Sequence, residues 1–453
     1  MSHFRSADRN QLFLLPPSIQ DWLPENHLAR FVVDIVEQLD LQEITKSYNN
    51  KGVLAYSPHM LVALLFYGYA TGVFSSRQLE RGTYDSVALR YVAANTHPDH
   101  DTIANFRRRF HSEIAMLFRQ VLLFAHASGV LRLGTVSLDG TKVKANASKH
   151  KALSYQHACK LEEQIQAQIT ELLSLAEAAD RADLPDGLSL PDELSRREKR
   201  IETIRAAKAE IERRAEERHA VEQREYEQKV AEREKKEKET GKKPRGKGPQ
   251  PPVLGPGPKD QVNLTDPESR IMPKGKSFKQ AYNAQASVDT QSMLIVGQRL
   301  TQHSNDKEEV IPMLERLGAL PAEIGKVNRI LCDAGYFSEA NVKGCLEAKV
   351  EPFIACAREK HNQSALARFA EPLQSCPDAT DDPVGNMRHR MKTQAGKALY
   401  ALRKSTVEPV FGIIKSILGL RQFSMRGVQL AASEWGMACT AWNIKRLYIL
   451  NMQ

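Results

Sequence analysis

Cysteine is scarce in this sequence, and no two cysteines stand close together. The six cysteines in 453 residues include no CxxC pair, which argues against both a zinc site and a disulfide framework. A long hydrophobic run is also missing, because the longest apolar stretch, around Met60 to Tyr69, is too short to span a bilayer. The first residues are polar and carry no apolar signal core. These absences predict a soluble protein of the reducing cytoplasm, with no membrane partner.

The remaining composition is that of a globular protein with an excess of positive charge. Hydrophobic residues make up 42% of the chain and charged residues 26%. The length predicts about two or three domains. The formal net charge of +9 favours a polyanionic partner. Nucleic acid is the foremost candidate, although a merely basic surface gives the same value.

Residues 1–130 carry apolar side chains at helical spacing and predict an all-α N-terminal domain. The clearest series is Leu28, Phe31, Val32, Ile35 and Leu39. A further helix is expected over 98–110, with Asp101 or Thr102 as its N-terminal cap. Three consecutive basic residues follow in it: Arg107, Arg108 and Arg109. They are candidate DNA-binding residues, and a solvated basic face is an equally good interpretation.

Residues 151–261 differ from both flanks and predict an insertion. Two amphipathic arms are expected, with a turn at 184–192 between them. Their apolar positions are Leu161, Ile165, Ile169 and Leu172 in the first arm, and Leu194, Ile201, Ile204 and Ile211 in the second. This spacing favours a helical hairpin or coiled coil. The stretch 232–259 is rich in lysine, glycine and proline, which predicts a flexible basic linker.

From Tyr282 onward the pattern becomes that of alternating strands and helices. Two runs of β-forming residues flank Thr290-Gln291-Ser292 and predict a hairpin. A helix, a buried strand over 327–332, a second helix and a further strand follow, and the C-terminus is helical again. Together with a short strand over 136–138, these elements predict an α/β domain that the insertion interrupts.

Three acidic residues follow or lie on these elements. Asp139 comes directly after 136–138, and Asp333 follows 329–332. The carboxyl ends of strands are the productive positions in open α/β sheets, and a glycine stands within two residues of each aspartate. Glu408 lies in a helical stretch and would add a third carboxylate. An oxygen-only donor set suits Mg²⁺, and two such ions can cleave a phosphodiester.

Each of these acids also has an ordinary structural interpretation. An aspartate after a strand is commonly a turn residue or a helix cap, and Glu408 could pair with a neighbouring lysine on the surface. Pro409 predicts a helix start or kink, which would place Glu408 near a helix N-terminus. Rival carboxylates are Asp266 in a turn, Asp289 at the hairpin turn, Asp306 as an N-terminal helix cap, and Glu434. Spacing alone leaves the choice open.

Several sequence blocks resemble the bacterial DDE-type insertion-sequence transposases, whose catalytic domain is RNase H-like. The N-terminal blocks are YSPHMLVALLFYGYATGVFSSRQLER and PDHDTIANFRRRF. The blocks around the acids are SLDGTKVKANAS, CDAGYF and VEPVFGIIKSILGLRQFSMRG. Their order along the chain agrees with that family. The resemblance implies an all-α N-terminal DNA-binding domain over 1–130, an RNase H-like mixed-sheet catalytic domain over 131–150 and 262–453, and the insertion over 151–261.

The resemblance further implies that Asp139, Asp333 and Glu408 are catalytic and bind the metal ions, two Mg²⁺ with Mn²⁺ as a substitute. Tyr400, Arg403, Glu408 and Lys415 supply the residue types of a Tyr-Arg-Glu-Lys signature. The step from Arg403 to Glu408 is one residue longer than usual, and Lys404 occupies the strict helical position. Either Arg403 or Lys404 would therefore contact the DNA phosphate, together with Lys415.

The implied activity is metal-dependent strand cleavage at transposon ends, followed by strand transfer into target DNA. The partners would be double-stranded terminal inverted repeats, target DNA and a second copy of the chain. The expected location is the bacterial cytoplasm, in association with the nucleoid. Two alternatives are a catalytically inactive DNA-binding repressor and an RNase H-like nuclease that does not join strands.

Overall fold

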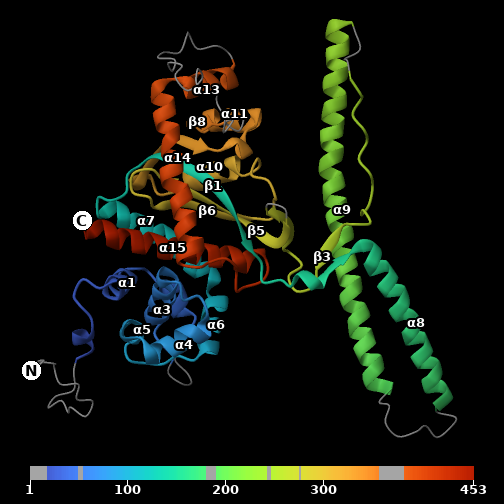
Figure 1. The fold of residues 1–453 in the computed structure, drawn as a ribbon, viewed down its shortest axis with the longest axis horizontal. Helices are drawn as coiled ribbons and strands as arrows, with labels where there is room; N and C mark the ends of the chain where they lie inside the picture. The colour runs from blue at the N-terminus through green and yellow to red at the C-terminus, as the bar shows by residue number, and fades with distance from the viewer. Residues whose placement is uncertain are drawn as a thin grey trace, which may run out of the picture. The chain divides into compact units, whose positions relative to one another are not determined.

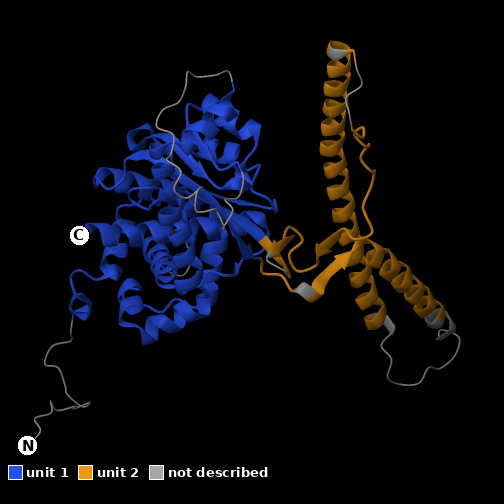
Figure 2. Ribbon diagram, turned by 45° about the horizontal axis from the view of Figure 1, so that its top comes forward, with its two compact units in different colours: residues 1–144, 282–453 blue, residues 145–281 orange. Residues whose placement is uncertain are grey.

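The computed structural model describes residues 18–48, 55–179, 190–241, 246–274, 277–356 and 382–452. The chain forms two compact units, residues 1–144 with 282–453 and residues 145–281 (Figure 2). The second unit contains the predicted insertion with wider bounds. The N-terminal helices do not form a unit of their own, because they pack with the sheet domain.

The N-terminal part of the first unit is helical, as predicted. Its elements are η1 (Ile19–Trp22), α1 (Leu28–Glu37), α2 (Gln42–Lys46), α3 (Pro58–Thr71), α4 (Ser76–Asp85), α5 (Val87–Val92), α6 (His100–Arg109) and α7 (His111–Ala127). Pro58 opens α3, and Gly72 ends it with φ +85°, the conformation that glycine adopts most easily. Within the described residues, no single helix is long and apolar enough to cross a membrane, and only the pair α3 and α4, bent by 95°, passes that test together.

A mixed sheet forms the centre of the first unit. The strands are β1 (Leu133–Lys144), β4 (Arg270–Lys274), β5 (Ser277–Asp289), β6 (Ile295–Thr301), β7 (Gly325–Cys332) and β8 (Glu351–Ile354). Strand β4 and residues 277–281 of β5 are counted with the second unit. Their order is β4-β5-β1-β7-β8, and β6 also pairs with β5. The β5–β6 hairpin is antiparallel, whereas β7 runs parallel to both β1 and β8. The predicted turn at Thr290–Ser292 is confirmed, and the Asp289 carboxylate accepts the backbone N–H of Ser292 there at 2.8 Å.

Helices flank this sheet (Figure 1). They are α10 (Val310–Gly318), η3 (Ala322–Ile324), η4 (Ala334–Tyr336), α11 (Glu339–Glu347), α13 (Pro383–Lys392), α14 (Gln394–Gly412), the π-helix η5 (Ile413–Ile417) and α15 (Val428–Asn451). Helix α15 packs against β6, α3 and α7. The buried side chain of Asn443 accepts the N–H of Ile295 and donates to its carbonyl, both at 2.8 Å. It thereby satisfies backbone groups of β6 that no neighbouring strand pairs.

The second unit contains two long helices that pack antiparallel. Its elements are η2 (Lys149–Lys151), β2 (Ala152–Ser154), α8 (Tyr155–Ala179), α9 (Leu190–Thr240) and β3 (Gln261–Asn263). The core includes Ile165 and Ile169 of α8 and Ile201, Ile204 and Ile211 of α9, which are apolar positions that the spacing predicted. Most of the turn predicted at 184–192 lies outside the described residues.

The stretch predicted as a flexible linker is partly ordered. Residues 232–240 belong to α9, because lysine and glutamate favour a helix. Beyond residues 242–245, which are not described, the chain returns along this helix. Arg233 donates to the Lys247 carbonyl at 2.9 Å, and Arg218 forms a two-point ion pair with Asp260 at 2.9 and 3.2 Å. Arginine side chains of α9 therefore hold a segment whose composition predicted no fixed structure.

Candidate active site

Asp139 and Asp333 come from neighbouring strands. The last registered pair of the parallel strands β1 and β7 is Leu138 with Cys332, and each aspartate follows directly. The strand predicted over 136–138 is longer than expected, since β1 continues to Lys144. Beyond Asp139 it gains a different partner: the Lys144 N–H donates to the Arg421 carbonyl, and the Phe423 N–H donates to the Lys144 carbonyl. Asp139 therefore lies within β1, at the point where β7 ends.

Asp139 is half-buried and surrounded by charge. Its Oδ1 accepts the Gly140 N–H at 2.8 Å. Burial raises the pKa of Asp139 to about 7, and the Asp333 carboxylate adds to this rise, while the Gly140 hydrogen bond opposes it. Two carboxylates this close repel each other when both are ionised. A cation between them would remove that repulsion.

Asp333 combines both interpretations that the sequence left open. It is the N-terminal cap of the short helix η4, and its Oδ1 accepts the Gly335 N–H at 2.8 Å. The same carboxylate lies close enough to Asp139 to affect its titration. Asp333 therefore caps η4 and also belongs to the candidate site beside Asp139.

Glu408 is connected to Asp139 by the guanidinium of Arg403. The Arg403 guanidinium donates to Glu408 Oε1 at 2.8 Å, and another of its nitrogens lies 3.7 Å from Asp139 Oδ2. The Arg403 side chain is 12% exposed, whereas that of Glu408 is 47% exposed. Arg403 therefore links the two acids that the sequence assigned to one site.

The expectation that Glu408 lies near a helix N-terminus is wrong. Helix α14 runs from Gln394 to Gly412 with Pro409 inside it. Pro409 removes one backbone donor, but the following turn is anchored by the buried side chains of Val410 and Phe411. Tertiary packing overrides the local signal, and Glu408 lies one turn before the end of α14.

The two lysines of the predicted site have different environments. Lys415, in the π-helix η5, donates to the Thr141 hydroxyl of β1 at 2.6 Å, so its ammonium lies beside the strand that carries Asp139. Lys404 is exposed on α14. Of the two candidates for the signature cation, Arg403 is the one that the fold brings to the acids.

Asp306 is a fourth acid at this place, and the sequence assigned it another role. Helix α10 starts at Val310 and its cap residue is Glu309, so the prediction of Asp306 as that cap is wrong. Its carboxylate instead accepts the side-chain amides of Asn283 at 2.6 Å and Gln285 at 2.8 Å. It also adds to the rise in the pKa of Asp139. Asp306 follows β6, which ends at Thr301, by several residues, so the rule that selected Asp139 and Asp333 directly after their strands did not select it.

The donor set suits a hard cation. Asp139, Asp333 and Asp306 supply only oxygen, and the buried Oδ1 of Asn283 has no hydrogen-bond partner. In the described part of the chain, however, no three Asp, Glu, His or Cys side chains are close enough together to hold a metal ion. Arg403, which pairs with Asp139 and Glu408, is the cation that occupies this position. The residues therefore fit a metal ion in chemistry, and completing the set with Glu408 requires the Arg403 pair to open.

The three consecutive arginines of α6 do not act alike. Arg107 is 6% exposed and donates to the Tyr69 hydroxyl at 3.1 Å and the Phe74 carbonyl at 3.2 Å. Tyr69 in turn donates to the buried Glu434 of α15 at 3.2 Å. The placement of Arg107 on a DNA-facing surface is therefore corrected: it ties α6 to α3. The cap of α6 is Asp99, two or three residues before the predicted caps.

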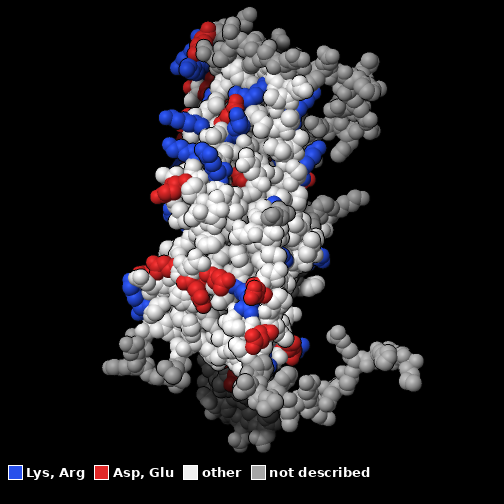
Figure 3. All heavy atoms as spheres, turned by 90° about the vertical axis from the view of Figure 1, so that its left-hand side faces the viewer, with Lys and Arg blue, Asp and Glu red and all other residues white. Residues whose placement is uncertain are grey.

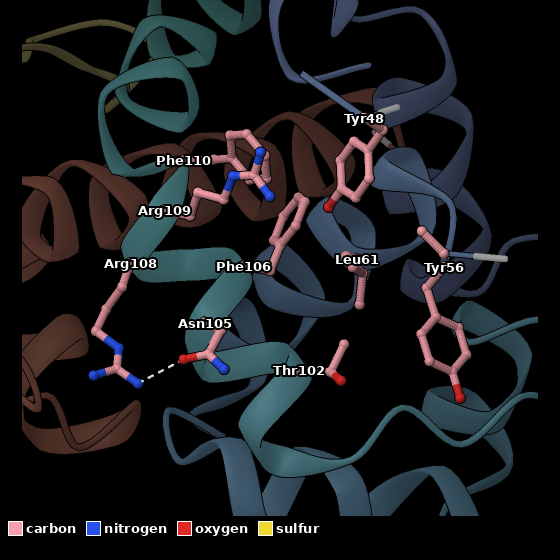
Figure 4. Close-up of a pocket in the computed structure, with 10 residues that line it drawn as sticks. Tyr48, Tyr56, Leu61, Thr102, Asn105, Phe106, Arg108, Arg109 and Phe110 are labelled. Carbon is pink, nitrogen blue, oxygen red and sulfur yellow. Dashed lines mark hydrogen bonds between the residues drawn. The ribbon is translucent and has the colours of Figure 1, made fainter. Parts of the chain in front are cut away.

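Arg108 and Arg109 line an open cavity of about 760 Å³ (Figure 4). Its wall includes the rings of Tyr48, Phe106 and Phe110. The Arg109 guanidinium lies 4.9 Å from the centre of the Phe110 ring, and Arg108 donates to the Asn105 side chain at 2.8 Å. No acidic residue lines this cavity in the part of the chain that the structure describes. It therefore offers positive charge and aromatic surface together.

Positive charge does not cover the molecule evenly. On the face drawn in Figure 3, lysine and arginine predominate toward one end, and aspartate and glutamate predominate toward the other, with mostly uncharged surface between. The net charge of +9 therefore does not make this face a continuous basic track.

Two family models match the chain in order. The transposase domain (DUF772) matches residues 17–109, and the transposase DDE domain matches residues 251–444. No curated protein and no solved structure matches it. The first match ends with α6, and the second contains Asp333 and Glu408, while Asp139 lies between the two. The chain is therefore a DNA transposase. It belongs to the DDE transposases of insertion sequences, a family that depends on divalent metal ions.

Proposed function

We propose that this transposase binds the terminal inverted repeats of its element, cleaves DNA there and transfers the freed end into target DNA. The observation that carries the proposal is the placement of Asp139 and Asp333 at the same point of the parallel strands β1 and β7. Arg403 joins Glu408 to that point. The mixed sheet with parallel β1, β7 and β8 also supports an RNase H-like catalytic domain.

In this proposal Asp139, Asp333 and Glu408 hold two Mg²⁺ ions, and Mn²⁺ can replace them. When bound, such ions supply an activated water and stabilise the leaving oxygen of the phosphodiester. Arg403 leaves Glu408 and donates to a DNA phosphate, because a guanidinium matches phosphate oxygens in two-point geometry. Thr141 keeps Lys415 beside β1, where its charge contributes to phosphate binding. Lys404, at the exposed edge of α14, contacts the backbone farther from the reacting bond.

The helical part of the first unit is proposed to bind the transposon ends through Arg108 and Arg109. Their cavity combines guanidinium groups with aromatic rings, which suits phosphate and base surfaces. Two ends must be held together for strand transfer, so the working form is proposed to be a homodimer. The antiparallel helices α8 and α9 are candidates for a coiled-coil contact in it. A bacterial cytoplasmic protein bound to the nucleoid is consistent with this function.

The catalytic part is tested with duplexes that carry the inverted repeats flanking the gene. Full-length protein should nick them and join them to target DNA in Mg²⁺ or Mn²⁺. Asp139→Ala, Asp333→Ala and Glu408→Ala should each abolish both steps, and undiminished activity in any of them would remove that residue from the site. End binding without cleavage would indicate a repressor. Cleavage without joining would indicate a nuclease.

The DNA-binding part is tested by the dependence of affinity on salt. Replacing Arg108 and Arg109 by glutamine should lower the slope of log affinity against log salt by about 0.9 for each lost phosphate contact. Arg132→Gln, which changes an exposed arginine outside the cavity, serves as the control. An unchanged slope in the double variant would place the DNA elsewhere.

A further inference from the structure

Asp306 is held in one orientation by two hydrogen-bond donors and one ion pair. Its Oδ1 accepts hydrogen bonds from the amides of Asn283 and Gln285, and the Lys142 ammonium lies 3.5 Å from it. Asn283 and Gln285 are fully buried, whereas Asp306 keeps 25% of its side chain exposed. Gln285 is bonded at both ends of its amide, and Asn283 donates to the His303 carbonyl as well as to Asp306. Buried amides bonded in this way do not rotate freely, so they fix the carboxylate and are fixed by it.

A chain of hydrogen bonds runs from Asp306 to the turn that begins at Asp333. Gln285 donates to Asp306 through Nε2 and accepts the Tyr336 hydroxyl through Oε1. Tyr336 is fully buried and closes η4, the helix capped by Asp333. Asn341 adds a parallel link, because its amide donates to the carbonyls of Lys307 at 2.6 Å and Tyr336 at 2.7 Å.

Two glycines leave the space that this arrangement needs. A Cβ on Gly140 would lie 2.8 Å from Asp306 Oδ1 and 2.2 Å from Gln285 Nε2. A Cβ on Gly335 would lie 3.0 Å from Asp333 Oδ1 and 3.8 Å from Asp306 Oδ2. The glycines that follow the two candidate metal-binding aspartates are thus the positions where a side chain would displace Asp306 or crowd Asp333.

We propose that Asp306 is a positioning residue that aligns Asp333 for metal binding through Gln285 and Tyr336. The proposal rests on the proposed function, which assigns Asp333 to the metal site. Residues that orient a metal ligand commonly change metal affinity by about 10- to 100-fold when they are removed. Both amide bonds end on Asp306 Oδ1, and the proposed effect passes through these amides. A bond from the second carboxylate oxygen to the ion is the alternative that Asp306→Asn tests.

The test measures Mn²⁺ affinity of the full-length protein by calorimetry, without DNA. Asp306→Ala removes the acceptor and should weaken binding about 10- to 100-fold. Asp306→Asn keeps one oxygen that can accept from both amides, so it should stay within about threefold of wild type. Tyr336→Phe keeps the buried ring but removes the last link, and should weaken binding about as much as Asp306→Ala. The double variant Asp306→Ala/Tyr336→Phe should bind Mn²⁺ about as weakly as either single variant, since both changes break the same chain of hydrogen bonds. Asp85→Asn, at an exposed position of α4, is the control.

Three results would overturn the proposal: wild-type affinity in Asp306→Ala, wild-type affinity in Tyr336→Phe, or an Asp306→Asn variant as weak as Asp306→Ala. The last of these would make Asp306 a direct ligand. Thermal melting shows whether each variant is folded, and if Asp306→Ala is not, the asparagine and phenylalanine variants decide. Failure of the proposed function looks different: Asp139→Asn and Asp333→Asn would then leave Mn²⁺ affinity unchanged.

Discussion

Arg403 is the residue on which the charge balance of the candidate site depends. It is the cation paired with both Asp139 and Glu408, and it opposes the rise in the pKa of Asp139. Its own neighbour Tyr400 is partly buried, which raises the pKa of that phenol. A guanidinium in this place keeps two acids near each other until a phosphate or a metal ion competes for them.

Mutation can distinguish the contributions of Arg403 and Lys404 to DNA cleavage. We expect Arg403→Ala to reduce single-turnover nicking of an inverted-repeat duplex by about 10²- to 10³-fold, the usual effect of losing one preorganised donor at a reacting phosphate. Lys404→Ala should reduce it less than about threefold, since exposed charges are well screened. The reverse order of the two effects would assign the phosphate contact to Lys404.

The pKa of Asp139 predicts how stability depends on pH in metal-free protein. An aspartate whose pKa is raised from 3.8 to about 7 by folding contributes stability below pH 3.8 that is lost as pH rises to about 7. Asp139→Asn cannot ionise, so its free energy of unfolding should exceed that of wild type by an amount that grows between about pH 4 and 7 and then stays constant. At about 1.4 kcal/mol for each pH unit, the difference should not exceed about 4 kcal/mol.

Urea unfolding in a chelator, repeated at several pH values, checks this expectation. A difference that does not vary with pH would mean that Asp139 titrates normally. Saturating Mg²⁺ should reverse the order, because only wild type gains stability from the bound ion.

At the scale of residues, an aspartate that directly follows a strand of an α/β sheet is a candidate site residue. This rule predicted that Asp139 and Asp333 would lie together. It could not predict Arg403 between Asp139 and Glu408, because that contact depends on the distance between α14 and β1. Asp306 does not follow its strand directly, since β6 ends at Thr301, and its position before a helix predicted a cap instead. Arg107 illustrates the opposite error, since a basic triplet gives no sign of which member faces the core.

At the scale of elements, α14 shows how packing overrides a helix-breaking residue. Pro409 leaves the Ser405 carbonyl without its helical donor, yet the helix continues into the π-helix η5. Single π-turns within helices are frequent at functional sites. Here the turn carries Lys415, whose ammonium bonds to Thr141 of β1.

Replacing Pro409 by alanine restores that donor. We expect Pro409→Ala to raise the free energy of unfolding by about 1–2 kcal/mol, which is less than the usual cost of an internal proline because the unfolded chain also becomes more flexible. Lys397→Ala, an exposed change in the same helix, should stay within about 0.5 kcal/mol. Chemical unfolding gives both values. A loss of stability in Pro409→Ala would show that packing of the ring outweighs the missing bond.

Apolar periodicity in the sequence was sufficient to predict the N-terminal helices and the β5–β6 hairpin. It was insufficient for segments whose partners lie far away in the sequence. The N-terminal helices and the β5–β6 hairpin follow from apolar spacing and turn residues. The second half of β1 does not, because its partner is the segment around Arg421–Phe423, far away in the sequence. The ordered segment at 246–260 was missed for a similar reason: arginines of α9 hold it, and local composition does not reveal such contacts.

At the scale of the whole molecule, the second unit is attached through two neighbouring chain ends. The Ala145 N–H donates to the Gln280 carbonyl at 3.0 Å, so the unit begins and ends at the same place. A unit with adjacent termini can be removed with little strain on the remaining chain. By contrast, the N-terminal helices are tied to the sheet domain through the Arg107–Tyr69–Glu434 network and cannot be separated in this way.

Replacing residues 145–281 by a short Gly/Ser linker removes β4 and residues 277–281 of β5 together with the two long helices, and should leave a folded first unit. We expect one cooperative thermal transition and a Mn²⁺ affinity within about threefold of the intact protein, since the candidate metal-site residues lie in the first unit. The oligomeric state, measured by light scattering on inverted-repeat DNA, should change if α8 and α9 form the dimer contact. Absence of a cooperative transition would show that the first unit depends on the second for folding.

The pairing of Lys144 with Arg421 and Phe423 also has a consequence for the time at which the enzyme becomes competent. The strand that carries Asp139 is synthesised early, but the segment that pairs with its far end, and the helix that carries Glu408, emerge from the ribosome much later. A nascent or prematurely terminated chain that stops before Phe423 lacks this pairing. Incomplete translation products that end before Phe423 should therefore lack the assembled candidate site.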